Sequence, residues 1–248
     1  MSNVLVNKIL EVEENIKQGD FDSIDFQDYY EGSLIPKVVK FNTICFGDFT
    51  ELSNEEKAKA INFQINIVNE EMVNEFRQFF GSDNPVEELD AIADTLFTLS
   101  YLHYQLGVVN DLPEEDYDVV NSLLNHAKLE LLVMDSDSFF NVYMRHFDAP
   151  IIIEASELVI ANNNQKFTDN PLEFEKWQSP KGENLVASSR EYGGVTYYVL
   201  VNENGKVRKK KGFKGVQLKP LVEKQGERFD NLMSGELIDD RDVNETEE

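Results

Sequence analysis

The chain has 248 residues, enough for one large domain or for one domain with appended segments, and its 41% hydrophobic residues are enough for a core. Its formal net charge of −24 argues against nucleic acid and anionic membranes as main partners, because both would be repelled. We expect a soluble cytoplasmic protein, since no apolar run is long enough for a bilayer, the N-terminus lacks the apolar centre of a signal peptide, and the single cysteine, Cys45, excludes internal disulfides and a thiolate metal cage.

The first part of the chain predicts two helices separated by a long loop. Apolar residues at helical spacing predict an amphipathic helix over residues 4–16. The segment 20–47 is acidic and aromatic and contains turn residues, so we expect it to be mostly loop. Ser53 followed by Glu56 is a capping-box pattern, and helix-forming residues continue from there to about Phe80.

The middle of the chain predicts further helices. Gly, Ser, Asp, Asn and Pro over residues 81–85 break the chain before a helix that we expect over 86–106. A proline opens the next predicted helix, 113–134, and a short helix over 135–146 follows it. Apolar spacing predicts another helix over 151–161.

The C-terminal part predicts a small β-hairpin and a tail. Residues 195–201 are β-prone, and Asn204 with Gly205 is a turn signal that leads into a second strand. The expected fold class is therefore mainly α, a helical core with a small C-terminal β-hairpin region. The chain divides into four parts: an N-terminal helix and acidic loop (1–50), an α-helical core (51–166), an extension with the hairpin and a basic segment (167–225), and an acidic tail that we expect to be disordered (226–248).

One acid pair lies on the first long helix. At about 100° per residue, the apolar residues of this helix form one stripe, and Glu71 and Glu75 lie one turn apart at its edge, on the side of Gln64. Glu70 points almost the opposite way, toward solvent. The two glutamates can therefore face a partly buried site together, although acid pairs at this spacing are also common on solvated helix faces.

A second acid pair lies on the helix 86–106, which is apolar on two opposite sides and is therefore expected to be central. Asp90 and Asp94 are one turn apart and share a stripe with Tyr101. Two buried aspartates repel each other and lose hydration, and this helix contains no lysine or arginine to pair with them. Mg²⁺ offers the simplest compensation, because it binds carboxylate oxygens and keeps several waters, which leaves room for phosphates.

The segments around both acid pairs are similar to a known family. Residues 67–76 (IVNEEMVNEF) and 89–97 (LDAIADTLF) resemble the all-α nucleoside triphosphate pyrophosphohydrolases, that is, the MazG-like enzymes with the dimeric dUTPases and phosphoribosyl-ATP pyrophosphohydrolases. The segments 38–47, 162–166 and 204–218 resemble, in the same order, motifs of the phosphoribosyl-ATP pyrophosphohydrolase-like branch of bacteria and their phages.

The resemblance implies an α-helical core, usually a homodimer or higher homo-oligomer, that cleaves a nucleoside triphosphate between its α and β phosphates and releases the monophosphate and pyrophosphate. It implies Mg²⁺, with Mn²⁺ as an alternative, as the cofactor. The residues that it assigns to the metal and to catalysis are Glu71, Glu75, Asp90 and Asp94. The residues expected to contact the substrate, with the two C-terminal lysines at its phosphates, are Gln64, Asn163, Lys166, Lys206 and Lys209.

The sequence departs from the family pattern at the first acid pair. Most relatives carry two glutamates three residues apart, whereas here Asn74 follows Glu71 by three residues and Met72 precedes Glu75 by three. Two alternatives therefore stay open. The first alternative to the enzyme is a catalytically weak or inactive protein of this fold that binds a nucleotide or a partner, and the second is an acidic helical interaction protein whose acid pairs are solvated. A phage-encoded enzyme of this kind is expected in the host cytoplasm.

Overall fold

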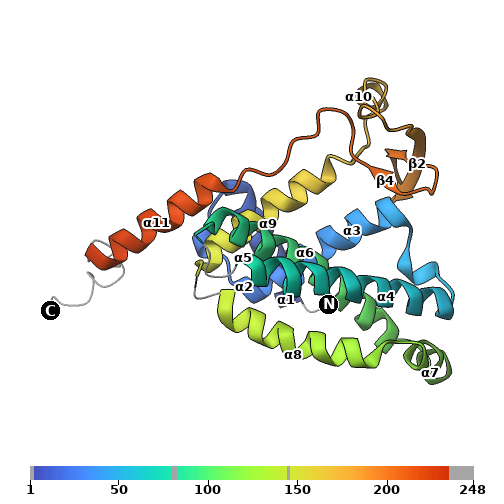
Figure 1. The fold of residues 1–248 in the computed structure, drawn as a ribbon, viewed down its shortest axis with the longest axis horizontal. Helices are drawn as coiled ribbons and strands as arrows, with labels where there is room; N and C mark the ends of the chain where they lie inside the picture. Colours follow the sequence, from blue (N-terminus) through green and yellow to red (C-terminus); the bar gives the residue numbers. More distant parts are fainter. Residues whose placement is uncertain (1–2, 80–82, 144–145, 235–248) are drawn as a thin grey trace.

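The computed structural model describes residues 3–79, 83–143 and 146–234. In this part of the chain it shows a mainly α-helical protein with a small antiparallel sheet near the C-terminal end, which confirms the predicted fold class (Figure 1). The helical elements up to the sheet are α1 (Asn3–Gln18), η1 (Phe21–Ser23), α2 (Phe26–Tyr29), η2 (Tyr30–Leu34), α3 (Ile35–Phe46), η3 (Phe49–Glu51), α4 (Asn54–Asn69), η4 (Glu70–Glu75), α5 (Phe76–Phe79), α6 (Pro85–Asn110), α7 (Glu114–Ser122), α8 (His126–Tyr143) and α9 (Ala149–Asn164). The C-terminal elements are β1 (Phe167–Thr168), α10 (Pro171–Phe174), β2 (Val186–Tyr192), β3 (Val195–Val201), β4 (Val207–Arg208) and α11 (Lys219–Ser234).

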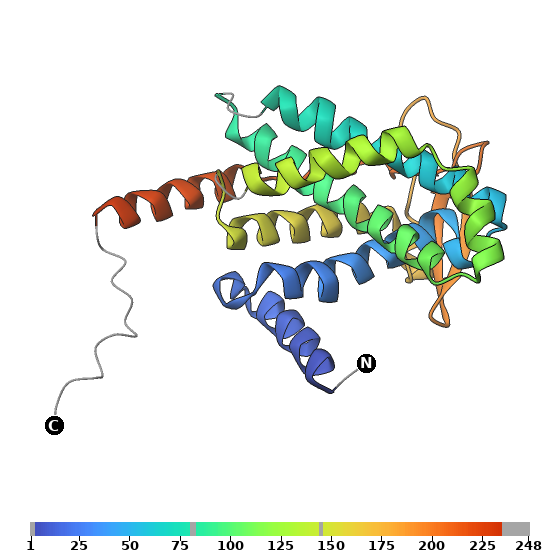
Figure 2. The same cartoon turned by 90° about the horizontal axis from the view of Figure 1, so that it is seen from below.

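Helix α6 is the centre of the helical body, as its two apolar sides predict. It packs against α3, α4 and α9, and its Leu89, Ile92 and Leu96 are fully buried (Figures 1 and 2). Burial of such side chains is the main favourable contribution to folding. Within the described ranges, no helix has the length and apolar character needed to cross a membrane.

The first long helix begins at the predicted capping box and continues to Phe79. The Ser53 hydroxyl accepts a hydrogen bond from the Glu56 N–H, and the Glu56 carboxylate accepts one from the Ser53 N–H. The winding changes along the way, because η4 is a π turn in which the Phe76 N–H donates to the carbonyl of Glu71, five residues earlier. The helix is therefore confirmed in its extent, with a local widening at the first acid pair.

The prediction of a mostly irregular segment over residues 20–47 is wrong. The segment forms α2, the π turn η2 and α3, and its apolar residues Leu34, Val38 and Ile44 are fully buried. The acidic residues of the preceding turns obscure this helical spacing in the sequence. Helix α3 ends at Gly47, whose positive φ of 100° favours glycine.

The predicted boundary between the helices 113–134 and 135–146 is also wrong, because the chain breaks earlier, between α7 and α8. Asn62 of α4 binds the backbone at this break from both sides. Its Nδ2 donates to the carbonyl of Leu123 at 2.9 Å, and its Oδ1 accepts from the N–H of Asn125 at 2.8 Å. A side chain that is distant in the sequence thus binds backbone groups between the end of α7 and the start of α8. The local sequence therefore does not show the break.

The other predicted helices are confirmed with longer bounds. Helix α6 continues through Gly107 to Asn110, since a glycine within a helix is unfavourable but tolerated. Helix α9 begins at Ala149 with Pro150 in its first turn, the position in a helix that suits proline.

The sheet extends the predicted hairpin by two unexpected strands, β1 and β2, both of which pair with β3. Strand β3 covers the predicted residues 195–201, and β4 pairs with it after the Asn204–Gly205 turn, as expected. Strand β2 pairs with β3 along its whole length, but its polar sequence, VASSREY, gave no strand signal. Its connection to β3 is Gly193–Gly194, where both residues have positive φ.

The sheet packs on α3 through a second, smaller core. Phe41, Ile44 and Cys45 of α3 contact a set of strand residues, and both cores include contacts to the central helix through Phe97. Figure 1 shows the sheet beside α3, at the end where α9 enters β1. This packing fixes the basic segment that follows β4 close to the helical body.

The expected disordered tail, 226–248, is helical as far as Ser234, as part of α11. The start of α11 packs against α6 and α9, and the rest of the helix extends away from the body (Figure 2). Residues 235–248 lie outside the described residues, so the expectation of disorder there stays a prediction.

Candidate functional site

The first acid pair lies in the π turn η4. Glu71 is half-buried, whereas Glu70 and Glu75 are exposed. Glu70 accepts a hydrogen bond from Asn74 Nδ2 at 2.7 Å on the outer side of the turn. The structure therefore confirms that Glu71, and not Glu70, faces the protein. Single π turns within α-helices are frequent at functional sites.

The second acid pair lies on the part of α6 that packs against η4. Burial, followed by the charges of Asp90 and Glu75, raises the pKa of Asp94 to about 7. Burial also raises the pKa of Asp90, and the charges of Glu87 and Glu75 add to this effect. The charge of Glu75, a carboxylate of the first pair, therefore affects the pKa of both aspartates.

Glu71 interacts electrostatically with carboxylates of both pairs. Burial, followed by the charges of Asp94 and Glu75 and a hydrogen bond with Glu75, raises the pKa of Glu71 to about 8. The four carboxylates thus form one group, which we call the acid cluster: Glu71, Glu75, Asp90 and Asp94. The helical face predicted for each of them brings the two pairs together.

Two lysines from the C-terminal part of the chain bring positive charge to the acid cluster. The charges of Lys166 and Lys209 oppose the increase in the pKa of Asp94. Burial lowers the pKa of Lys166, as does the neighbouring charge of Lys209, while Asp94 opposes this. Lys166 Nζ donates to Asn163 Oδ1 at 2.7 Å, so the structure brings Asn163 to the same place.

Lys206 lies farther from the acid cluster. Its side chain is exposed at the turn between β3 and β4, and its backbone N–H donates to Asn202 Oδ1 at 2.9 Å. Its charge contributes to lowering the pKa of Lys166, as the smallest of several influences. Of the two C-terminal lysines that the resemblance assigns to the phosphates, Lys209 is therefore the better placed.

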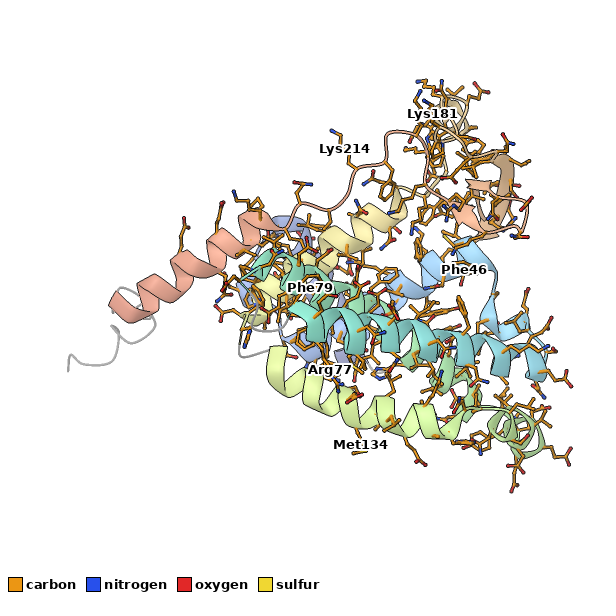
Figure 3. The ribbon with its side chains drawn as sticks, in the orientation of Figure 1. Phe46, Arg77, Phe79, Met134, Lys181 and Lys214 are labelled. Atoms are coloured by element: carbon orange, nitrogen blue, oxygen red, sulfur yellow. The ribbon has the colours of Figure 1, made fainter. Side chains whose placement is uncertain are left out.

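Gln64 lies on α4, one turn of chain or more before the first acid pair, and lines a separate cavity of about 220 Å³. Its Nε2 donates to the carbonyl of Thr98 at 2.7 Å, which joins α4 to α6. Figure 3 shows Phe46, a cavity residue, apart from Arg77 and Phe79, which lie at the C-terminal end of the α4–α5 helix.

Sequence reasoning missed two amide side chains of this cavity, Asn42 of α3 and Gln105 of α6. Both are buried, with 7% and 2% of their surface exposed. The available signal was a single amide within an otherwise apolar helical stretch. That signal was hidden for Asn42, because its helix was expected to be loop.

The acid cluster has the chemistry of a Mg²⁺ site. Among the described residues, no group of three or more His, Cys, Asp or Glu side chains stands ready to hold a metal ion. Burial, and after it the charges of neighbouring carboxylates, nevertheless raise the pKa values of Glu71, Asp90 and Asp94, and a bound cation would offset both effects. Mg²⁺ and Mn²⁺ take oxygen ligands and complete their coordination with water and phosphate, so these donors fit them.

Comparisons of the chain with models of protein families, with curated proteins and with solved structures found no match.

Proposed function

We propose that this chain is a Mg²⁺-dependent nucleotide pyrophosphohydrolase, which converts a nucleoside triphosphate or a related nucleotide to the monophosphate and pyrophosphate. The acid cluster is the observation that carries the proposal. Carboxylates from η4 and α6 face one another there, and Lys166 and Lys209 lie beside them. Carboxylates alone would repel a triphosphate, so this combination suits a site in which cations lie between acid and phosphate.

The roles follow from burial and charge. Glu71, Glu75, Asp90 and Asp94 would hold Mg²⁺, which when bound neutralises phosphate charge and lowers the pKa of water. Lys166 and Lys209 bind phosphate oxygens of the substrate. The hydrogen bond from Lys166 to Asn163 fixes the position of the ammonium group.

The reaction transfers the nucleotidyl group to water. The water oxygen bonds to the α phosphorus while the bond from this phosphorus to the bridging oxygen breaks, and pyrophosphate leaves with the bonding electrons. Glu75 accepts the proton of the attacking water, because it is the exposed member of the acid cluster and water reaches it. Lys209 and Lys166 neutralise the charge that develops on the leaving pyrophosphate.

We also propose that the protein acts as a homodimer or higher homo-oligomer in the cytoplasm. The outer side of α8 supports contact between copies, because Leu131, Val133 and Met134 are largely exposed there. Size-exclusion chromatography with light scattering measures the mass directly, and a monomer at assay concentration argues against this arrangement.

A nucleotide panel tests the proposed function. The purified protein is incubated with each ribonucleoside and deoxyribonucleoside triphosphate and Mg²⁺ in ¹⁸O-labelled water. We expect monophosphate and pyrophosphate, with the label in the monophosphate, and loss of turnover in EDTA. Glu71→Gln should lose turnover, while Glu70→Gln, the exposed neighbour, should keep it.

The remaining outcomes separate the alternatives. Diphosphate and orthophosphate as products would contradict cleavage between the α and β phosphates. Nucleotide binding without turnover would identify an inactive nucleotide-binding protein. A melting temperature that neither Mg²⁺ nor any nucleotide changes would identify an acidic interaction protein with solvated acid pairs.

A further inference from the structure

The cavity beside Gln64 lies on the same pair of antiparallel helices as the acid cluster. Elements α3, α4 and α6 contribute its walls. Gln64 precedes Glu71 by seven residues, and Tyr101 follows Asp94 by seven, so the cavity is displaced from the acid cluster by about 10 Å along both helices. This is about the span of a sugar and its 5′-phosphate. A nucleotide whose phosphates lie at the acid cluster would therefore place its base at the cavity.

The size of the cavity suits one planar ring system. Its volume of about 220 Å³ is below the range of about 300–1,000 Å³ for pockets that take drug-sized ligands. Phe46 and Phe63 line it although 61% and 62% of their surfaces are exposed. Tyr101 lines it from α6. Aromatic side chains in such a position offer faces on which a base stacks.

Three amide side chains line the cavity: Asn42, Gln64 and Gln105. Asn42 uses its Nδ2 to donate to the carbonyl of Val38 at 2.9 Å, as Gln64 does with the carbonyl of Thr98. These bonds fix the two amide groups and leave their oxygens as the atoms that can still accept. Gln105 adds a third, because its Oε1 is buried without a hydrogen-bond partner. A buried acceptor without a donor is unfavourable, so these oxygens favour a ligand rich in N–H groups.

We propose that this cavity binds the base of the substrate, and that it prefers adenine or cytosine, in which an exocyclic amino group occupies the position where hypoxanthine or uracil carries an oxygen. The amino group donates to the amide oxygens, whereas the carbonyl oxygen that replaces it in hypoxanthine or uracil would meet them acceptor to acceptor. The inference rests on the proposed function for the position of the phosphates. It adds to that function the class of base and three residues that select it: Asn42, Gln64 and Gln105.

Matched substrate pairs test the proposal. We compare kcat/KM for dCTP with that for dUTP, and for dATP with that for dITP, since each pair differs in replacement of an amino group by an oxygen. The amino member should be preferred at least about tenfold in the better-hydrolysed pair, because sites built for a hydrogen bond reject an analogue that cannot make it. Equal values in both pairs, or preference for the keto member, would overturn the proposal and leave the pyrophosphohydrolase function intact.

A variant links the preference to the cavity. Gln105→Leu removes the unpartnered oxygen and keeps much of the side-chain volume. It should lower the amino-to-keto ratio without lowering the melting temperature, while Gln18→Leu, at an exposed glutamine of α1, should leave the ratio unchanged. An unchanged ratio in Gln105→Leu would contradict the assignment.

Two measurements cover the remaining outcomes. If no triphosphate is hydrolysed, calorimetric titration with dCMP and dUMP, and with dAMP and dIMP, tests the cavity alone, and tighter binding of the amino member supports it. If Phe63→Ser splits an oligomer and leaves the ratio unchanged, the mouth of the cavity is a contact with a second copy of the chain, and the proposal fails.

Discussion

Glu70 and Glu71 are sequence neighbours with opposite environments. Glu70 is exposed and bonded to Asn74, while Glu71 is half-buried against the acids of α6. The helical periodicity alone separated the two glutamates correctly. Element η4 is a π turn, but the change in winding falls at the acid pair itself, so Glu71 still faces α6.

Stability of the metal-free protein should depend on pH through the acid cluster. The pKa of Glu71 is raised to about 8 and that of Asp94 to about 7, so the folded state binds protons more tightly than the unfolded chain does. The resulting stability is present at acidic pH and is lost as the pH rises through about 7 and 8. Urea unfolding in EDTA at several pH values measures this.

Variants show whether the acid cluster is the source. The double variant Glu71→Gln, Asp94→Asn should lose less stability between acidic and alkaline pH than the wild type, while Glu70→Gln should behave as the wild type does. An equal loss in the double variant would assign the pH dependence to the overall negative charge of the chain.

The grouping of the three amide side chains at the cavity could not be predicted from the sequence. Gln64 was placed near the site by its helical face, but Asn42 and Gln105 come from two other helices whose meeting point depends on the packing of the body. Lys166 and Lys209 were expected only from the resemblance, since no local pattern links the end of α9 or the segment after β4 to α6. Their proximity to Asp94 is a result of the tertiary structure.

At the scale of elements, the break between α7 and α8 depends on Asn62. Replacing Asn62 by alanine removes both hydrogen bonds to this break and should destabilise the protein by about 1–2 kcal/mol, the usual effect of losing a helix-capping side chain. Thermal unfolding measures the loss, with Asn69→Ala, at an exposed asparagine at the end of α4, as the control. Equal melting temperatures for the two variants would show that Asn62 does not hold the break.

The elements that sequence reasoning missed share one cause. Helix α3, the break after α7 and strand β2 are defined by contacts with distant parts of the chain, whereas α4 and α6 carry local N-terminal caps. The Ser53 capping box and the chain break before α6 were readable in the sequence. The pairing of β2 with β3 was not, because most of the β2 side chains are polar and none of them is buried.

At the scale of the whole molecule, the sheet brings a basic segment to an acidic site. The smaller core of α3 and the sheet places Lys209 where its charge reaches Asp94, although the two are distant in the sequence. Lys209→Ala should lower kcat/KM for the triphosphate by about tenfold or more, as expected for loss of a charged contact to phosphate. The steady-state assay uses Lys211→Ala as the control, because Lys211 Nζ lies 3.3 Å from Gln178 Oε1 instead. Equal losses in the two variants would indicate a general effect of positive charge.

Calorimetric titration of the metal-free protein with Mg²⁺ at about pH 7 tests the acid cluster as a metal site. Two buffers of different ionisation enthalpy are used. We expect binding with net release of protons, because the pKa of Glu71 is about 8 and that of Asp94 about 7, and Mg²⁺ binds the deprotonated carboxylates. Asp94→Asn should lose the binding and Glu70→Gln should keep it. No binding heat in the wild type, or the same affinity in Asp94→Asn, would show that the acid cluster does not hold the metal.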